Sequence, residues 1–215
     1  MKDIEKARQG LSDAETGGIA TEGFTVPDMG EYALLPGNPR RISLMAGQWD
    51  EGTSKEYDLN RGYRACTGAY KGTPLTAMST GMGGPNLELP LTTMAAAGVN
   101  TFIRVGTTGA IQKGIQIGDI IINDCNVRLD GTSRQYVMEE YPSAASPEVV
   151  MALVQACENL GFKYHVGVGC TTASFYAGQS RASFGGYKRQ DADALYKDLQ
   201  SANVLNYDME GAALF

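Results

Sequence analysis

The sequence predicts an α/β fold that is three-layer-like, with a central mixed sheet flanked by helices. From residue 32 onward, short apolar runs closed by glycine-rich turns alternate with segments of helical periodicity. The chain has 215 residues, enough to bury a sizeable core as one large domain. We see no internal repeat that would indicate a solenoid or an array.

Residues 1–30 are polar, mixed in charge and weakly periodic, so we expect an N-terminal arm or extension there and the folded domain at residues 31–215. The apolar runs predict strands at residues 32–35, 75–79, 101–105, 117–127, 164–168 and 204–207.

Helical patterns cover residues 85–97, 147–160 and 191–200. Pro90 is expected to distort the first of them. The second is the clearest, because Ser146 suits an N-cap and Gly161 suits a stop. Its apolar stripe consists of Val150, Leu153, Val154 and Cys157.

Composition excludes several classes of protein. The net charge is −6 and the basic residues are scattered singly, which argues against a nucleic-acid-binding surface but not against a small anionic ligand. Four widely spaced cysteines and a single histidine make a zinc site improbable, and we expect the thiols to be buried. Without a signal peptide or a membrane-spanning apolar run, the sequence predicts a reduced, cytoplasmic protein.

One anion site is predicted around Arg104, which stands within an otherwise apolar strand. A buried guanidinium needs a partner, and Thr107 and Thr108 add hydroxyls just beyond it. The alternative partner is an internal carboxylate such as Asp119. Arg40 and Arg41 follow a turn at residues 36–39, and one of them is a candidate for completing an anion clamp, the alternative being a solvated pair.

A glycine-rich loop at residues 81–84 follows another predicted strand. It matches neither the P-loop nor the dinucleotide fingerprint, because Asn86 stands where the last glycine would be. The loop lets a ligand approach the backbone closely, or else it is simply a tight strand-to-helix turn.

Residues 175–181 combine groups that suit a planar ligand. Phe175 offers an aromatic face, Gln179 offers both a donor and an acceptor, and Arg181 offers a permanently charged fork of donors. A pyrimidine base fits this set, and the competing interpretation is an ordinary surface loop.

Two carboxylates, Asp208 and Glu210, follow the last predicted strand. One of them suits a ribose-like diol, since a carboxylate accepts two hydrogen bonds, although acidic residues are also favourable at a helix N-terminus. His165, the only histidine, is interpreted as structural.

Several motifs occur together in one order, and they resemble the uridine phosphorylase branch of the hexameric nucleoside phosphorylase family. The resemblance covers residues 35–215 and rests on Pro36-Gly37-Asn38-Pro39-Arg40-Arg41, Ser79-Thr80-Gly81-Met82-Gly83-Gly84-Pro85, Phe102-Ile103-Arg104-Val105-Gly106-Thr107-Thr108-Gly109-Ala110, Val127-Arg128-Leu129-Asp130-Gly131, Phe175-Tyr176-Ala177-Gly178-Gln179-Ser180-Arg181 and Asn206-Tyr207-Asp208-Met209-Glu210.

The resemblance implies a role for each matching residue. Phosphate would be held by Gly37, Arg41, Arg104 and Thr107, and Arg61 looks like the family arginine that reaches into a neighbouring subunit's phosphate site. Met209 and Glu210 would bind ribose. Phe175, Gln179 and Arg181 would bind uracil.

The implied reaction is the reversible phosphorolysis of uridine to uracil and ribose 1-phosphate, as in pyrimidine nucleoside salvage. Arg104, Thr107 and Arg181 would act on the reacting groups, with inorganic phosphate as co-substrate and with no cofactor or metal. The family also implies a homohexamer with active sites shared across a dimer interface, and no nucleic-acid or membrane partner.

Four features depart from the family pattern. The family's N-terminal histidine at the ribose 5′-hydroxyl has no counterpart before Tyr32. Gly62 replaces a glutamate associated with a monovalent cation, so that cation is not expected, and Asp208 replaces the more usual glutamate. The sequence ends at Phe215, so we expect the domain to lack the C-terminal strand and helix that cover the base pocket.

Two alternative functions stay open at this point. One is a purine nucleoside phosphorylase, or a hydrolytic nucleosidase, of the same superfamily. The other is a non-catalytic relative that binds nucleosides.

Overall fold

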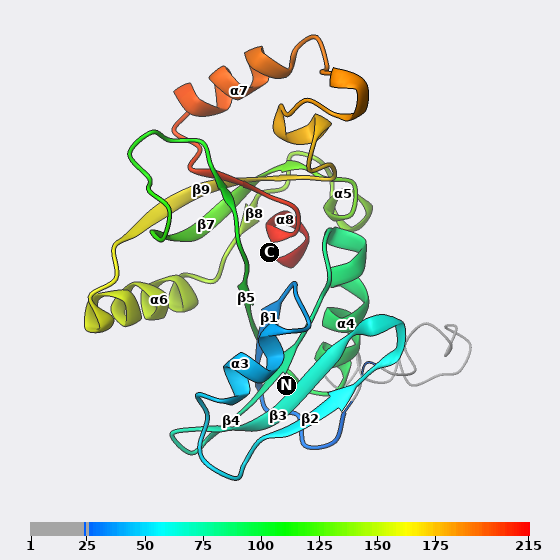
Figure 1. Cartoon of the computed structure of the whole chain (residues 1–215), viewed down its shortest axis with the longest axis vertical. Coiled ribbons are helices and arrows are strands. Elements are labelled where there is room, and N and C mark those ends of the chain that lie inside the picture. Colours follow the sequence, from blue (N-terminus) through cyan, green and yellow to red (C-terminus); the bar gives the residue numbers. More distant parts are fainter. Residues whose placement is uncertain (1–23, 25) are drawn as a thin grey trace. The chain divides into compact units, whose positions relative to one another are not determined.

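The protein folds into two compact α/β units, Met1–Gly106 and Thr107–Phe215, in a computed structural model that describes Phe24 and residues 26–215 (Figure 1). Each unit contains one mixed five-stranded sheet with helices packed against it. The α/β class and the mixed sheet predicted from the sequence are therefore confirmed, with two sheets in place of one central sheet. Most of the predicted N-terminal arm, residues 1–30, falls outside the described residues.

The sheet of the first unit has the strand order β2-β3-β4-β1-β5. Strand β1 is parallel to β4 and to β5, whereas β3 is antiparallel to both β2 and β4. Because β1 and β5 are parallel, their carboxyl ends meet at the same edge of the sheet. The strands are β1 (Tyr32–Pro36), β2 (Lys55–Asp58), β3 (Arg64–Tyr70), β4 (Thr73–Met78) and β5 (Thr101–Val105).

The described part of the first unit contains two α-helices. The short helix α3 (Arg41–Ala46) buries Ile42 and Ala46 against Cys66 and Ala77 of the sheet. The longer helix α4 (Gly84–Ala96) begins directly after the glycine-rich loop. It runs through Pro90 without a break, although proline lacks the N–H that bonds the carbonyl four residues earlier.

The sheet of the second unit has the order β6-β10-β9-β7-β8. The three central strands are parallel, and the two-residue strands at the edges are antiparallel to their neighbours. Ile111, Cys170, Leu199, Val204 and Tyr207 form a buried cluster on this sheet. The strands are β6 (Gly109–Ala110), β7 (Ile120–Leu129), β8 (Ser143–Ala144), β9 (Tyr164–Thr172) and β10 (Asn206–Asp208).

Four α-helices belong to the second unit. They are α5 (Ser133–Tyr136), α6 (Pro147–Leu160), α7 (Ala192–Ser201) and α8 (Gly211–Leu214). Two short 3₁₀ turns, Ala177–Gln179 and Phe184–Gly186, lie on the connection between β9 and α7.

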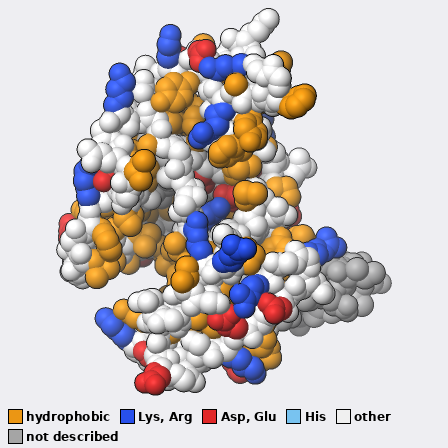
Figure 2. All heavy atoms as spheres, viewed as in Figure 1, with side chains coloured by type: hydrophobic (Ala, Val, Ile, Leu, Met, Phe, Trp, Pro, Cys, Tyr) orange, Lys and Arg blue, Asp and Glu red, His pale blue; other side chains and the backbone are white. Residues whose placement is uncertain are grey.

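Helix α6 has the predicted bounds, and Gly161 ends it in the left-handed conformation (φ 70°) as expected. Ser146 occupies the N-cap position as predicted, although its side chain makes no capping hydrogen bond. In the apolar stripe, Cys157 is buried and the other members are half-buried. Figure 2 shows apolar side chains at the surface over α6, where Met151 and Leu160 are exposed.

The free cysteines follow the prediction at three positions: Cys66, Cys157 and Cys170 are buried and Cys125 is half-buried. Across the described residues, no helix combines the length and the apolarity that a membrane crossing requires.

Candidate active site

The first unit brings together three residues that the sequence assigns to an anion. Gly37 follows β1, Arg41 begins α3, and Arg104 lies in β5 opposite Leu35 of β1. The Arg41 Nη1 donates a hydrogen bond to the Val105 carbonyl (3.1 Å). The two guanidinium-bearing segments therefore meet at the carboxyl ends of β1 and β5.

The guanidinium of Arg104 lies against two glycine backbones. A Cβ placed on Gly37 would lie 3.7 Å from the Arg104 Nη2, and a Cβ on Gly106 would lie 2.1 Å from the Nη1. Only glycine leaves room for this position of the guanidinium at residue 106.

Asp119, the carboxylate considered as an alternative partner of Arg104, has other partners. It accepts a hydrogen bond from the Lys163 Nζ (2.7 Å), and the His165 Nε2 lies 2.8 Å from the same oxygen. Lys163, the Gln116 backbone N–H and His165 hold the pKa of Asp119 well below its usual range. This cluster fits the structural interpretation of His165.

The glycine-rich loop at residues 81–84 connects β4 to α4. The Thr80 and Gly81 N–H groups donate to the carbonyls of Pro36 (2.9 Å) and Gly37 (3.0 Å). Gly81 and Gly83 have positive φ angles of 68° and 89°. These bonds support the interpretation of the loop as a tight turn. They also hold the backbone of residues 36 and 37 in place.

Arg61 lies on a different segment of the first unit from Arg41 and Arg104. It is exposed on a 3₁₀ turn, Asn60–Gly62, which joins β2 to β3, and β4 separates these strands from β1. Its φ of 59° is left-handed, a conformation that disfavours residues with a side chain.

The second unit gathers Phe175, Gln179 and Arg181 on the loop after β9. The Arg181 guanidinium stacks over the Phe175 ring, 4.5 Å from its centroid. Gln179 is buried, and its Nε2 lies 3.5 Å from the Asp208 carbonyl oxygen. A Cβ on Gly109 would lie 3.0 Å from the Arg181 Nη2, so the guanidinium also lies against β6.

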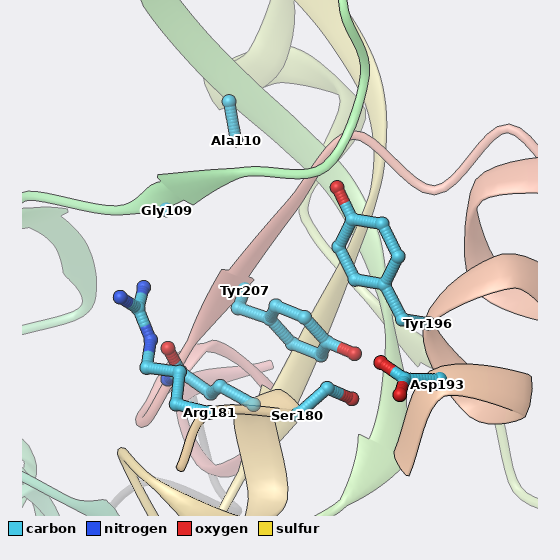
Figure 3. Close-up of a pocket in the computed structure, with 8 residues that line it drawn as sticks. Gly109, Ala110, Ser180, Arg181, Asp193, Tyr196 and Tyr207 are labelled. Carbon is cyan, nitrogen blue, oxygen red and sulfur yellow. The ribbon is translucent and has the colours of Figure 1, made fainter.

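A cavity of about 310 Å³ opens beside this loop. Figure 3 shows the Arg181 guanidinium directed toward Gly109 and the Tyr207 ring between Arg181 and Tyr196. Asp193 and Tyr196, both on α7, line the same cavity. Sequence reasoning missed these two residues, because nothing distinguishes them from the other polar residues of an amphipathic helix.

The two carboxylates after β10 have different environments. Asp208 accepts hydrogen bonds from the Thr171 Oγ1 (2.5 Å) and from the Gly211 N–H (2.6 Å), so it caps the start of α8. Glu210 is 3% exposed and Met209 is half-buried. The two interpretations therefore apply to different residues. Asp208 bonds the first N–H of a helix, and Glu210 remains the candidate for binding a diol.

The two adjacent threonines also differ. The Thr108 Oγ1 accepts from the Asn206 Nδ2 (2.7 Å) and donates to the Tyr207 carbonyl (2.5 Å). Its hydroxyl is therefore used within the fold, which corrects the expectation that both hydroxyls serve an anion. Thr107, the first residue of the second unit, is exposed.

Among the described residues, no grouping of His, Cys, Asp and Glu could hold a metal ion.

The chain is similar to known proteins over most of its length. A family described as the phosphorylase superfamily matches residues 31–215. A uridine phosphorylase of Thermococcus kodakarensis is 49% identical over 188 residues, which cover 87% of this chain and 67% of that protein. One of Haemophilus influenzae is 39% identical over 184 residues, covering 85% and 72%.

A relative with a different name is a guanosine phosphorylase of Halorubrum lacusprofundi. It is 32% identical over 188 residues, which cover 87% of this chain and 72% of that protein. The family match spans most of the chain, and both kinds of relative cover more than four fifths of it. This chain therefore belongs to the phosphorylase superfamily.

Proposed function

We propose that this protein is a uridine phosphorylase, a pentosyltransferase that converts uridine and phosphate reversibly to uracil and ribose 1-phosphate. The observation that carries the proposal is the Arg181 guanidinium stacked over Phe175 next to the buried Gln179. The 49% identity to a uridine phosphorylase supports the choice of base.

Phosphate, the co-substrate, is assigned to Gly37, Arg41, Arg104 and Thr107. Arg41 and Arg104 supply two permanent positive charges at the ends of neighbouring strands, and a guanidinium fork matches the geometry of phosphate oxygens. Gly37 has no side chain that would meet the Gly81 carbonyl oxygen, which lies 2.9 Å from the place of a Cβ.

The nucleoside is assigned to residues of the second unit. Glu210 accepts hydrogen bonds from the 2′- and 3′-hydroxyls, and Met209 packs on the ribose. Phe175 packs beside the base. Gln179 and Arg181 bind its carbonyl and N–H groups.

The chemistry follows from these charges. As the C1′–N1 bond breaks, positive charge grows on the ribose and negative charge grows on the departing uracil. Phosphate stabilises the ribosyl cation and then bonds to C1′. Arg181 and Gln179 stabilise the uracil anion, so preorganised charge supplies most of the rate enhancement.

The test is a phosphate-dependent assay of uridine cleavage that detects uracil and ribose 1-phosphate. We expect turnover with phosphate and none without it, and cleavage without phosphate would indicate a hydrolase. Replacing Arg181 with Ala should lower kcat/KM by roughly 100-fold or more, because the charge that receives the leaving base is lost. Arg189→Ala is the matched control, since Arg189 is a surface arginine that pairs with Asp191.

A purine substrate is the second candidate, because one relative is named guanosine phosphorylase. Uridine, guanosine and inosine should compete in one reaction mixture, and we expect uridine to be consumed first. Preferential cleavage of either purine nucleoside would contradict the assignment of Gln179 and Arg181 to a pyrimidine. Uridine binding without turnover would indicate a non-catalytic relative.

A further inference from the structure

A series of hydrogen-bonded polar side chains joins two segments of the second unit, residues 107–109 and 206–210. Both segments carry residues that we propose to bind substrate. Asn206 is 1% exposed, and its Nδ2 donates to the Thr108 Oγ1 (2.7 Å). The Thr108 hydroxyl in turn donates to the Tyr207 carbonyl (2.5 Å). The backbone pairing of β6 with β10 covers only two residues of each strand, so these side-chain bonds add to a short connection.

The orientation of the Asn206 amide is set by a second asparagine. The Asn123 Nδ2 donates to the Asn206 Oδ1 (2.8 Å) and to the Gly167 carbonyl (3.1 Å). The Asn206 Nδ2 also donates to the Asn123 Oδ1 (3.2 Å). Since the Gly167 carbonyl can only accept, it fixes the Asn123 nitrogen, and through this pair it fixes the Asn206 nitrogen on the side of Thr108. A Cβ on Gly169 would lie 2.8 Å from the Asn123 Nδ2, so this glycine makes room for the amide.

The Thr108 hydroxyl lies close in the structure to segments with three proposed roles: binding phosphate, binding the base and binding ribose. Thr107, assigned to phosphate, is its neighbour in the chain. Gly109, on its other side, lies against the Arg181 guanidinium. Tyr207, whose carbonyl accepts a hydrogen bond from this hydroxyl, lies three residues before the proposed ribose residue Glu210.

We propose that Asn206 and Thr108 are positioning residues that hold Thr107, Arg181 and Glu210 in register for phosphorolysis. The proposal rests on the proposed function for its catalytic meaning. The Thr108 hydroxyl does not donate to substrate in this arrangement, since its one proton is bonded to the Tyr207 carbonyl. Their effect is on geometry, and errors of about 1 Å at a reacting centre cost roughly 100-fold in rate.

The decisive pair of variants is Thr108→Val and Thr108→Ser. Valine keeps the shape and removes the hydroxyl, so we expect kcat to fall roughly 10- to 100-fold, with a smaller change in the KM for uridine. Serine keeps the hydroxyl and should restore most of the activity. Thr73→Val, at an exposed position in the other unit, is the control for the substitution itself.

A double-mutant cycle tests whether Asn206 acts through Thr108. If it does, Asn206→Leu combined with Thr108→Val should be about as slow as the slower single variant, rather than slower by the product of both effects. Multiplying effects would overturn the link between the two residues. The Thr108 pair answers the main question even if the Asn206 variant does not fold.

Hydrogen–deuterium exchange gives a readout that needs no activity. The amides of residues 107–110 should exchange faster in Thr108→Val than in the wild type and Thr108→Ser. If the wild-type protein shows no turnover, the proposed function is wrong. The exchange rates would still test whether Thr108 holds residues 107–109 to residues 206–210. Wild-type turnover with normal kcat and normal exchange in Thr108→Val would overturn only the positioning role.

Discussion

Arg104 illustrates how a functional side chain depends on neighbours that have no side chain. Its guanidinium occupies the space that a Cβ at Gly106 would need, at 2.1 Å from the Nη1 and 3.1 Å from the Cζ. The obstacle is the far end of a flexible side chain, so a larger residue at 106 would move the guanidinium and leave the strand in place.

We therefore predict that Gly106→Ala weakens the use of phosphate without unfolding the protein. The KM for phosphate should rise roughly 10- to 100-fold, as expected for losing a hydrogen bond to a charged group worth about 1.5–3 kcal/mol. Steady-state kinetics with varied phosphate would measure the effect, and circular dichroism would check the fold. Gly114→Ala, where a Cβ meets nothing within 4 Å, should behave like the wild type. A normal phosphate KM in Gly106→Ala would contradict the assignment of Arg104.

At the residue scale, the sequence indicated which segments carry candidate residues, but it did not indicate which of two similar residues in a segment has which role. Arg41 and Arg104 were both assigned to loops near strand ends, and the Arg41 side chain bonds the carbonyl of Val105, the residue after Arg104. The difference between Thr107 and Thr108 was not predictable, because Asn206, which binds Thr108, is almost one hundred residues away. Asp208 likewise differs from Glu210 through its bond to Thr171.

Helix α4 shows how an element tolerates a residue that should break it. Pro90 has no N–H to donate to the carbonyl of Asn86 four residues earlier. The Tyr63 Oη donates to that carbonyl instead, at 3.0 Å. Burial raises the pKa of Tyr63, which keeps the phenol protonated and able to donate.

Tyr63→Phe should therefore destabilise the protein by about 1 kcal/mol, because the Asn86 carbonyl loses its donor. The same change in a Pro90→Ala background should cost less, since the new backbone N–H at position 90 can take over. Urea unfolding of the four proteins would measure both costs, with Tyr187→Phe as an exposed control. Equal costs in the two backgrounds would show that Tyr63 does not compensate for Pro90.

The strands and helices found from the sequence were those with a strong local pattern. Residues 101–105 became β5 and residues 147–160 became α6, with the predicted bounds. Sequence reasoning missed β2, because it is a largely exposed edge strand of charged residues that only its pairing with β3 stabilises. It also missed β6 and β8, since two residues are too few to show alternation.

The starts of β7 and β9 are tied together by Asp119, which predicts a pH dependence of stability. The pKa of Asp119 lies well below its ordinary value of 3.8, chiefly because Lys163 donates to it. A carboxylate with a lowered folded-state pKa stabilises the fold above its unfolded pKa, and this stabilisation is lost as the pH falls below about 4.

Asp119→Asn should accordingly lower the free energy of unfolding near pH 7. The difference from the wild type should shrink as the pH falls below about 4, where the wild type loses the same interaction. Urea titrations at a series of pH values would measure it, with the exposed Glu51→Gln as a control. A gap that stays constant down to about pH 3 would mean that the charge of Asp119 contributes nothing.

At the scale of the whole molecule, the proposed residues are divided between the two units of the chain. Gly37, Arg41 and Arg104 belong to the first unit, and the proposed ribose and base residues belong to the second. Arg61 does not lie on the segments that carry Arg41 and Arg104, since its turn joins β2 to β3. A left-handed backbone at a non-glycine residue costs about 1–2 kcal/mol, and such strain often marks a functional position.

We propose that Arg61 completes the phosphate site of a neighbouring subunit, which predicts complementation between two inactive variants. Arg61→Ala and Arg181→Ala should each be nearly inactive alone. In a mixed dimer, one of the two sites would combine an intact Arg181 with an intact Arg61 from the partner. Equal co-expression with random pairing makes half of the dimers mixed, so about a quarter of all sites should be active.

The measurement is uridine phosphorolysis by the co-expressed protein, with native mass spectrometry to verify that mixed oligomers form. If mixed oligomers form and activity stays at the mean of the two parents, Arg61 acts within its own subunit or not at all.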